Sequence, residues 1–219
     1  MTLIIGARCR DGITLAGDRR VLRGTEYSEE KKIRLVFPNF IVGASGVSGL
    51  MDNFIRDMTT FIQSRGGRVA WVEFLNKLED IIRQLYERYH PRLGADYQFD
   101  VLYAFKDTPS TAHLFYIDRR GFSQEIRTFG IIGHGQPHAL PFVKALYNSN
   151  RTMQEINKLS TFILELVDKH NVDLSVGGKP QIFNVPYEGD TKELSEEEID
   201  NLIKEVSPTG QKLLESLNL

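Results

Sequence analysis

The sequence predicts an α+β fold in which helices cover antiparallel β-sheet, and two observations support it. Strand-like and helix-like segments occupy separate blocks of the 219 residues, an order that favours antiparallel sheet over alternating βαβ units. The composition is that of a globular chain, with 41% hydrophobic and 26% charged residues. We therefore expect a single domain covering residues 1–219, in which residues 187–219 form a C-terminal helical extension.

The first block of the chain is predicted to form two hairpins in antiparallel sheet. Residues 3–9 and 13–18 are apolar and are joined by Asp11-Gly12, a pair that supplies the positive φ angles of a tight turn. A second apolar pair follows at residues 33–37 and 40–44. These four segments account for most of the chain between Thr2 and Ser45.

The later elements follow from hydrophobic spacing and from capping signals. In chain order we expect helices over residues 50–62 and 74–89, strands over 97–105, 113–117 and 125–129, two helices after 135, a strand over 181–185 and tail helices. Pro91 is expected to end the second helix, and Pro208 to stand at the start of the last one. Capping boxes are expected at Thr152 and at Ser195.

Charge, cysteine content and hydropathy exclude several functional classes. The net charge of −2 gives no basic surface for nucleic acid and no reason to expect a membrane partner. No apolar run approaches the ~20 residues that span a bilayer, and the start of the chain has no basic segment of a signal peptide. Cys9 is the single cysteine, which excludes a disulfide framework and fits a reducing cytoplasm. We expect a cytoplasmic protein without metal or cofactor.

Thr2 is the first candidate for chemistry. Removal of Met1 would give a threonine whose free α-amine lies beside its own hydroxyl. An α-amine has a pKa near ~7.7–8.0 and can act as a general base at neutral pH. A hydroxyl activated by its own terminal amine is a known form of nucleophilic catalysis. Many proteins begin with Met-Thr for no catalytic reason, so the surrounding motifs must decide.

Those motifs occur in order along the chain. They are Arg10 to Arg20 (RDGITLAGDRR), Lys31-Lys32-Ile33, Ala44-Ser45-Gly46 and His170 to Gly178 (HNVDLSVGG). Together with Thr2 they resemble the proteasome β-subunit family of N-terminal nucleophile hydrolases, from Thr2 to Val185. The resemblance implies a four-layer αββα sandwich, with two antiparallel sheets between helical layers. It also implies assembly into a ring or homo-oligomer, and a peptide or unfolded protein as substrate.

The resemblance implies roles for the matching residues. Thr2 would be the nucleophile, and the ammonium of Lys32 would favour loss of the hydroxyl proton. Asp18 would keep that lysine charged and oriented. Gly46 would offer its backbone N–H to the oxyanion. Because the loop after Arg20 is one residue shorter than usual in the family, Lys31 is the alternative to Lys32.

Supporting residues are also implied, with two departures from the family pattern. Arg20 would brace the site, and Asp173 would hydrogen-bond near the threonine amine. The family has serines where this chain has His134 and Val176, and both serines help to hold the amine. His134 is a polar replacement, whereas Val176 cannot hydrogen-bond through its side chain. The sequence thus predicts an active site with an altered environment around the amine.

Two further functional hypotheses compete with that of a threonine peptidase. If an amine resolves the acyl-enzyme in place of water, the protein is a transpeptidase or another amide-processing enzyme. If Met1 is retained, the protein is a non-catalytic structural subunit of a related ring. The α-type subunits of the family are such scaffolds, but they start with an extra helix that this sequence does not contain.

Overall fold

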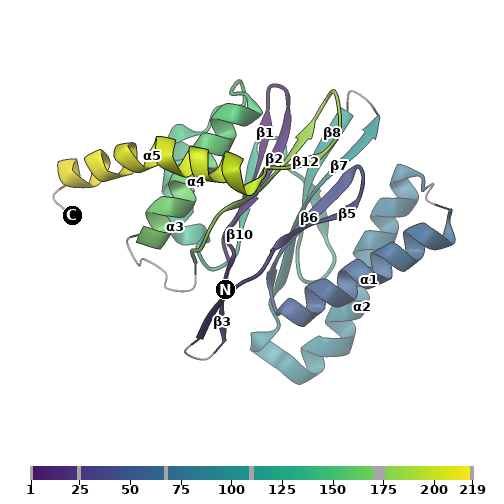
Figure 1. Ribbon diagram of the computed structural model, residues 1–219. Helices are drawn as coiled ribbons and strands as arrows, with labels where there is room; N and C mark the ends of the chain where they lie inside the picture. Colours follow the sequence, from purple (N-terminus) through teal and green to yellow (C-terminus); the bar gives the residue numbers. More distant parts are fainter. Residues whose placement is uncertain (1, 24–25, 67–68, 109–110, 170–175, 218–219) are drawn as a thin grey trace.

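The protein is a four-layer αββα sandwich, as expected from the family resemblance (Figure 1). The computed structural model describes residues 2–23, 26–66, 69–108, 111–169 and 176–217. Across these ranges, two five-stranded antiparallel sheets lie face to face, one with the order β10-β1-β2-β11-β12 and the other with the order β5-β6-β7-β8-β9. Helices α3, α4 and α5 cover the first sheet, and α1 and α2 cover the second.

The elements follow one another in the predicted block order. The strands are β1 (Ile4–Cys9), β2 (Gly12–Gly17), β3 (Arg20–Arg23), β4 (Glu26–Glu29), β5 (Ile33–Phe37), β6 (Phe40–Gly46), β7 (Phe99–Thr108), β8 (Thr111–Ile117), β9 (Ser123–Glu125), β10 (Phe129–Ile132), β11 (Gln181–Pro186) and β12 (Lys192–Glu193). The helices are α1 (Ser48–Ser64), α2 (Trp71–Leu93), α3 (Gln136–Leu146), α4 (Met153–Lys169) and α5 (Glu196–Leu217), with a short 3-10 turn at Gly94–Asp96. None of these helices is both long enough and apolar enough to cross a membrane.

The two predicted hairpins form, but they belong to different sheets. β1 pairs with β2 around Asp11-Gly12, and β5 pairs with β6. A third hairpin, β3 with β4, lies between them and was not predicted. Its strands are short and all four residues of β4 are exposed, so β4 has no alternation of buried and exposed positions that the sequence would reveal.

Three predicted element boundaries were wrong. Helix α2 continues through Pro91. Because proline has no N–H, the carbonyl oxygen of Glu87 loses its partner within the helix, but Glu87 is exposed and water can bond that oxygen. Helix α5 likewise runs through the exposed Pro208 as one helix. The predicted strand 125–129 is two strands, since β9 pairs with β8 whereas β10 pairs with β1 of the other sheet.

Both predicted capping boxes are present. The Thr152 N–H and hydroxyl donate to Glu155 Oε2, and the Glu155 N–H donates back to Thr152 Oγ1. Ser195 and Glu198 exchange the same pair of bonds at the start of α5. The segment expected to be a C-terminal extension also supplies β12, which pairs with β11, and α5 packs its buried face near α4.

The alternation of side chains along β1 decides how the N-terminus enters the site. Ile4 packs in the apolar layer between the sheets, and Leu3 and Ile5 pack against α3 and α4 on the other face. Successive residues of extended chain face opposite sides. Thr2, one position before Leu3, is therefore on the face that looks toward the second sheet.

Candidate active site

A buried ion pair lies next to the N-terminal strand. Lys32 Nζ is 2.8 Å from Asp18 Oδ2, and the two side chains are 7% and 1% exposed. Asp18 follows β2 and Lys32 precedes β5, so the pair joins the ends of two strands that belong to different sheets. Lys32 also donates to the carbonyl oxygen of Arg20 at 2.6 Å.

Asp18 connects this pair to the chain beside Thr2. Its Oδ1 accepts the backbone N–H of Leu3 at 2.8 Å, and its Oδ2 accepts the N–H of Gly177 at 3.2 Å. Thr2 itself is buried, with 4% of its surface exposed. One carboxylate therefore fixes both the lysine ammonium and the backbone of the residue that follows Thr2.

Burial is the largest influence on the protonation of both members of the pair. It lowers the pKa of Lys32 and raises the pKa of Asp18, and their mutual attraction opposes each shift. The attraction between the two groups favours their charged forms, and groups shifted by burial beside a charged partner are typical of functional sites.

The loop at residues 133–135 closes over the main chain of Thr2. Gly135 N–H donates to the Thr2 carbonyl oxygen at 3.2 Å. Gly133 has a φ of +99°, and a Cβ placed on it would come within 2.0 Å of that same oxygen. Only glycine fits both conditions. His134 lies in this turn with an exposed side chain, so the loop reaches Thr2 through its glycine backbone.

Gly46 is the last residue of β6 and also requires glycine. Its φ is +126°, and a Cβ there would lie 1.8 Å from the carbonyl oxygen of Gln98. Gly46 pairs with Phe99 across the sheet. The neighbouring Ser45 is buried, and its Oγ lies 3.2 Å from the Cβ position of Gly133. The end of β6 therefore reaches the loop that covers Thr2.

The other predicted site residues lie further out or outside the described chain. Arg20 forms an ion pair of 2.7 Å with Asp168 and donates to the Val176 carbonyl oxygen at 3.1 Å. Its side chain thus holds the 176–178 turn, and its own carbonyl oxygen contacts Lys32. Lys31 points to the surface, where it pairs with Glu193 at 2.8 Å. Asp173 lies outside the described residues.

Val176 lies close to the N-terminal strand and brings no polar side chain there. Its side chain is fully buried and packs in the apolar cluster that contains Leu3. The Cβ position of Gly135 lies 3.0 Å from Val176 Cγ2. The side chain at this position therefore contributes apolar packing beneath the N-terminal strand and no hydrogen bond.

Gln181 is a site residue that sequence reasoning missed. Its side chain is 0% exposed, and its Oε1 accepts the backbone N–H groups of Lys32 at 3.1 Å and of Ile33 at 3.0 Å. Its Nε2 donates to the Ile33 carbonyl oxygen at 2.9 Å. The amide thereby fixes the backbone from which Lys32 projects. A glutamine at the start of an apolar strand gives no signal of this contact, which joins positions 149 residues apart.

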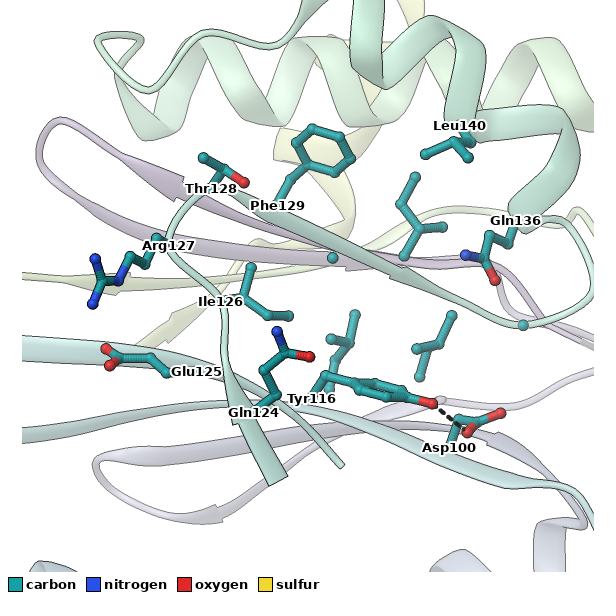
Figure 2. A pocket seen from close by; sticks show the side chains of 15 residues that line it. Asp100, Tyr116, Gln124, Glu125, Ile126, Arg127, Thr128, Phe129, Gln136 and Leu140 are labelled. Carbon is teal, nitrogen blue, oxygen red and sulfur yellow. Dashed lines mark hydrogen bonds between the residues drawn. The ribbon is translucent and has the colours of Figure 1, made fainter. Parts of the chain in front are cut away.

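A cavity of about 720 Å³ opens beside this site, between the β10 edge of one sheet and the β8–β9 edge of the other (Figure 2). Its lining includes Gly133, which contacts Thr2, and Glu125 and Arg127 lie at the end opposite Asp100. Its size is within the range of ligand sites. In the described part of the chain, no three His, Cys, Asp or Glu side chains cluster as a metal site would require.

Two antiparallel sheets stacked face to face between helical layers are the fold of the N-terminal nucleophile hydrolases, and the buried Lys32–Asp18 pair lies beside Leu3, the residue that follows Thr2. A sequence model of the proteasome subunit family matches residues 2–176. The chain therefore belongs to the proteasome subunit family.

The sequence identity between this chain and its relatives is low, although the alignments cover most of the chain. It is 28% identical to a proteasome subunit beta of Stackebrandtia nassauensis, covering 94% of this chain and 77% of that one. It is 27% identical to a proteasome subunit alpha of Methanococcus maripaludis, covering 80% and 69%. Among solved structures it is similar to Anbu (ancestral beta-subunit) from Yersinia bercovieri, with a TM-score of 0.80, 14% identity and coverage of 99% and 96%. These values describe a divergent, proteasome-like protein.

Proposed function

We propose that this protein is a threonine-type peptidase whose nucleophile is Thr2, exposed by removal of Met1. The observation that carries the proposal is the position of Asp18, which holds the Lys32 ammonium and the Leu3 N–H with one carboxylate. Through Asp18, this arrangement brings a buried cation close to the backbone of Leu3, the residue that follows Thr2. Membership of the proteasome subunit family adds support, since its β-type relatives are among the similar chains.

In the proposed reaction, the Thr2 hydroxyl attacks the carbonyl carbon of a peptide bond. The α-amine takes the hydroxyl proton and passes it to the leaving amine, so that an ester forms at Thr2 and the C–N bond breaks. Water then adds to the ester with the amine again as base, and the second product leaves with a new carboxyl group. Lys32 stabilises the developing negative charge on the threonine oxygen.

The remaining residues have supporting roles in this proposal. Gly46 offers its N–H to the oxyanion, and its lack of a side chain leaves room for the Gln98 carbonyl oxygen at the end of β6. Gln181 and Arg20 fix the chain on either side of Lys32. Asp173 and His134 are proposed neighbours of the amine. Because Val176 replaces a hydrogen-bonding side chain with an apolar one, we expect an amine whose basicity differs from that of the β-type relatives.

The proposed setting follows the family. Proteasome-family proteins form oligomeric rings, and we propose that this chain forms a homo-oligomer or a ring with related subunits in the cytoplasm. Its substrate would be a peptide or unfolded protein, with neither nucleic acid nor membrane as partner. Transfer of the acyl group to an amine in place of water is the alternative outcome at the same Thr2 ester.

Intact-mass measurement tests the proposal directly. Protein purified from its native host is expected to lack the mass of Met1, and a peptide epoxyketone is expected to add once per chain. Such a reagent bonds both a hydroxyl and a free amine, so it reports an N-terminal nucleophile. Thr2→Ala should abolish the adduct and Thr2→Ser should retain it. Retention of Met1 in essentially all molecules, or an adduct that persists in Thr2→Ala, would contradict the proposal.

A further inference from the structure

The cavity beside the site has a carboxylate at each end and a lining of mixed polarity between them. Asp100 and Tyr116 lie together at one end, whereas Glu125 and Arg127 lie at the opposite end (Figure 2). Between the two ends the lining includes the polar side chains of Gln124, Thr128 and Gln136 and the apolar side chains of Leu102, Ile126 and Phe129. A ligand in this cavity would therefore meet a carboxylate at either end.

A short chain of contacts connects Asp100 to Thr2. Gly133 packs against the Thr2 carbonyl oxygen, and Ser45 Oγ packs against Gly133. Ser45 and Asp100 are direct partners in the β6–β7 ladder. Directly opposed residues of an antiparallel pair have their side chains on the same face, with Cβ atoms about 5 Å apart. Asp100 is thus next to the serine that borders the loop over Thr2.

The face on which Asp100 lies is the one that looks toward Thr2. Leu102 and Ala104 alternate with their neighbours along β7 and pack in the layer between the two sheets. Asp100, two residues before Leu102, has the same orientation. Thr2 is on the facing side of the other sheet. The acidic end of the cavity and the N-terminal threonine therefore border the same space between the sheets.

Asp100 is held in place but retains capacity for a ligand. The Tyr116 hydroxyl donates to Asp100 Oδ1 at 2.8 Å. Across the ranges that the structure describes, Asp100 Oδ2 has no hydrogen-bond partner and the carboxylate has no ion pair. A carboxylate has about four lone-pair sites. The second oxygen is thus available to accept a hydrogen bond from a cationic group.

The electrostatics of Asp100 also favour a cation. Burial raises the pKa of this carboxyl, against the opposing effects of the Tyr116 hydroxyl and of Arg119, while Asp118 adds to the increase. A positively charged ligand would offset part of the effect of burial and favour the ionised carboxylate. At the other end of the cavity, Glu125 is already engaged, since it pairs with Arg8 at 3.2 Å and with His113 at 3.0 Å. Of the two acidic ends, the one near Thr2 is the unpaired one.

We propose that this cavity is a substrate subsite in which Asp100 and Tyr116 bind a lysine or arginine side chain next to the scissile bond. The mixed lining between the two ends would contact neighbouring residues of the same peptide. This inference rests on the proposed function for its place in a reaction, but the binding of a cationic peptide can be measured without turnover.

The test compares peptides that differ in one charge. Fluorescein-labelled peptides with a central lysine, norleucine or glutamate are titrated into the full-length, assembled protein, and binding is followed by fluorescence anisotropy. We expect the lysine peptide to bind about tenfold to a hundredfold more tightly than the norleucine peptide, the range for a hydrogen-bonded charge. We expect the glutamate peptide to bind most weakly.

Two variants identify the carboxylate responsible. D100N keeps the size of the side chain and an acceptor for Tyr116, and it should reduce the lysine preference to about one. E125Q changes the same charge at the far end of the cavity and should leave the preference intact. Equal binding of lysine and norleucine peptides to the wild type, or a preference that survives D100N, would overturn the inference.

Epoxyketone labelling of the same samples separates this inference from the proposed function. Lysine-selective binding that D100N removes, in protein that takes no epoxyketone, would support the subsite and reject the peptidase. Labelling at Thr2 together with equal binding of all three peptides would reject the subsite and leave the peptidase standing. Circular dichroism of D100N would show whether its fold is retained, and Y116F provides a second variant that should also weaken the lysine preference.

Discussion

The ammonium of Lys32 and the carboxylate of Asp18 lie 2.8 Å apart, and both are more than nine-tenths buried. Lys31, one residue earlier, lies half exposed against Glu193. The two lysines, which both precede β5, therefore have different surroundings although they are adjacent in the sequence. Lys32 pairs with Asp18, the carboxylate that also accepts the Leu3 N–H next to Thr2.

Lys32→Met is expected to slow epoxyketone labelling of Thr2 by at least about a hundredfold, because the charge that stabilises the threonine oxygen is removed. Lys31→Met is the matched control and should change the rate less than about threefold, because an exposed ion pair contributes little. Rates of adduct formation by mass spectrometry give both values. If Lys31→Met is the slow variant, Lys32 is not the catalytic lysine.

Asp18→Asn is expected to destabilise the protein by about 3–5 kcal/mol, because it removes the buried carboxylate that pairs with the Lys32 ammonium. Adding Lys32→Met removes the buried ammonium as well, so the double variant should be more stable than the sum of the two single changes predicts. Urea unfolding of the four proteins measures this coupling. Strictly additive free energies would mean that the two groups do not interact, contrary to the contact described.

Sequence patterns predicted individual hairpins and helix starts because turns and capping are local, whereas the four-layer arrangement was expected from the family resemblance. The Asp11-Gly12 turn and the Thr152 capping box depend on residues close together in the chain, and both formed as expected. Gln181 and Gly133 could not be found in this way. Their contacts with Lys32 and Thr2 arise only when strands distant in sequence pair.

The wrong prediction of a single strand over residues 125–129 has the same cause, because contacts between distant strands decide it. Alternation of polar and apolar residues there suggests a single strand, but it contains no information about which sheet each end joins. The Ile126 N–H bonds the Leu114 carbonyl oxygen of one sheet, while the Thr128 carbonyl oxygen accepts the Arg8 N–H of the other. The segment between them forms one wall of the cavity that contains Asp100.

Gly133→Ala is expected to abolish Thr2 labelling, because the added Cβ would lie 2.0 Å from the Thr2 carbonyl oxygen. The φ of +99° adds about 1–3 kcal/mol of strain. Gly49→Ala is the control: nothing lies within 4 Å of its Cβ position in α1, and it should stabilise the protein by about 0.5–1 kcal/mol. Normal labelling in Gly133→Ala would show that the loop does not position Thr2.

Cys9 is expected to resist thiol reagents in the folded protein. Burial raises the pKa of its thiol to about 12, and only 4% of the residue is exposed. The thiolate that reacts is therefore almost absent at pH 8. Iodoacetamide should modify Cys9 only after unfolding in urea and should leave epoxyketone labelling of the native protein unchanged. Rapid alkylation of the native protein, or loss of labelling with it, would implicate the thiol in the site.

Glu198 should make stability depend on pH at the start of α5. Its hydrogen bond with Lys192, followed by the Ser195 N–H, lowers the pKa of this carboxyl from 4.5 to about 2. A carboxyl whose folded pKa is lowered stabilises the protein above its unfolded pKa, and the effect is lost as pH falls from about 4.5 toward 2. Glu198→Gln keeps the capping geometry without the charge, so it should cost less than about 1 kcal/mol at pH 7, with both partners exposed. Thermal unfolding at a series of pH values should show this difference in stability shrinking as pH falls below 4.5.

Glu197→Gln, an exposed neighbour in the same turn, is the control for net charge. An equal, pH-independent effect of both variants would show that the Ser195–Glu198 cap does not depend on the ionised carboxylate.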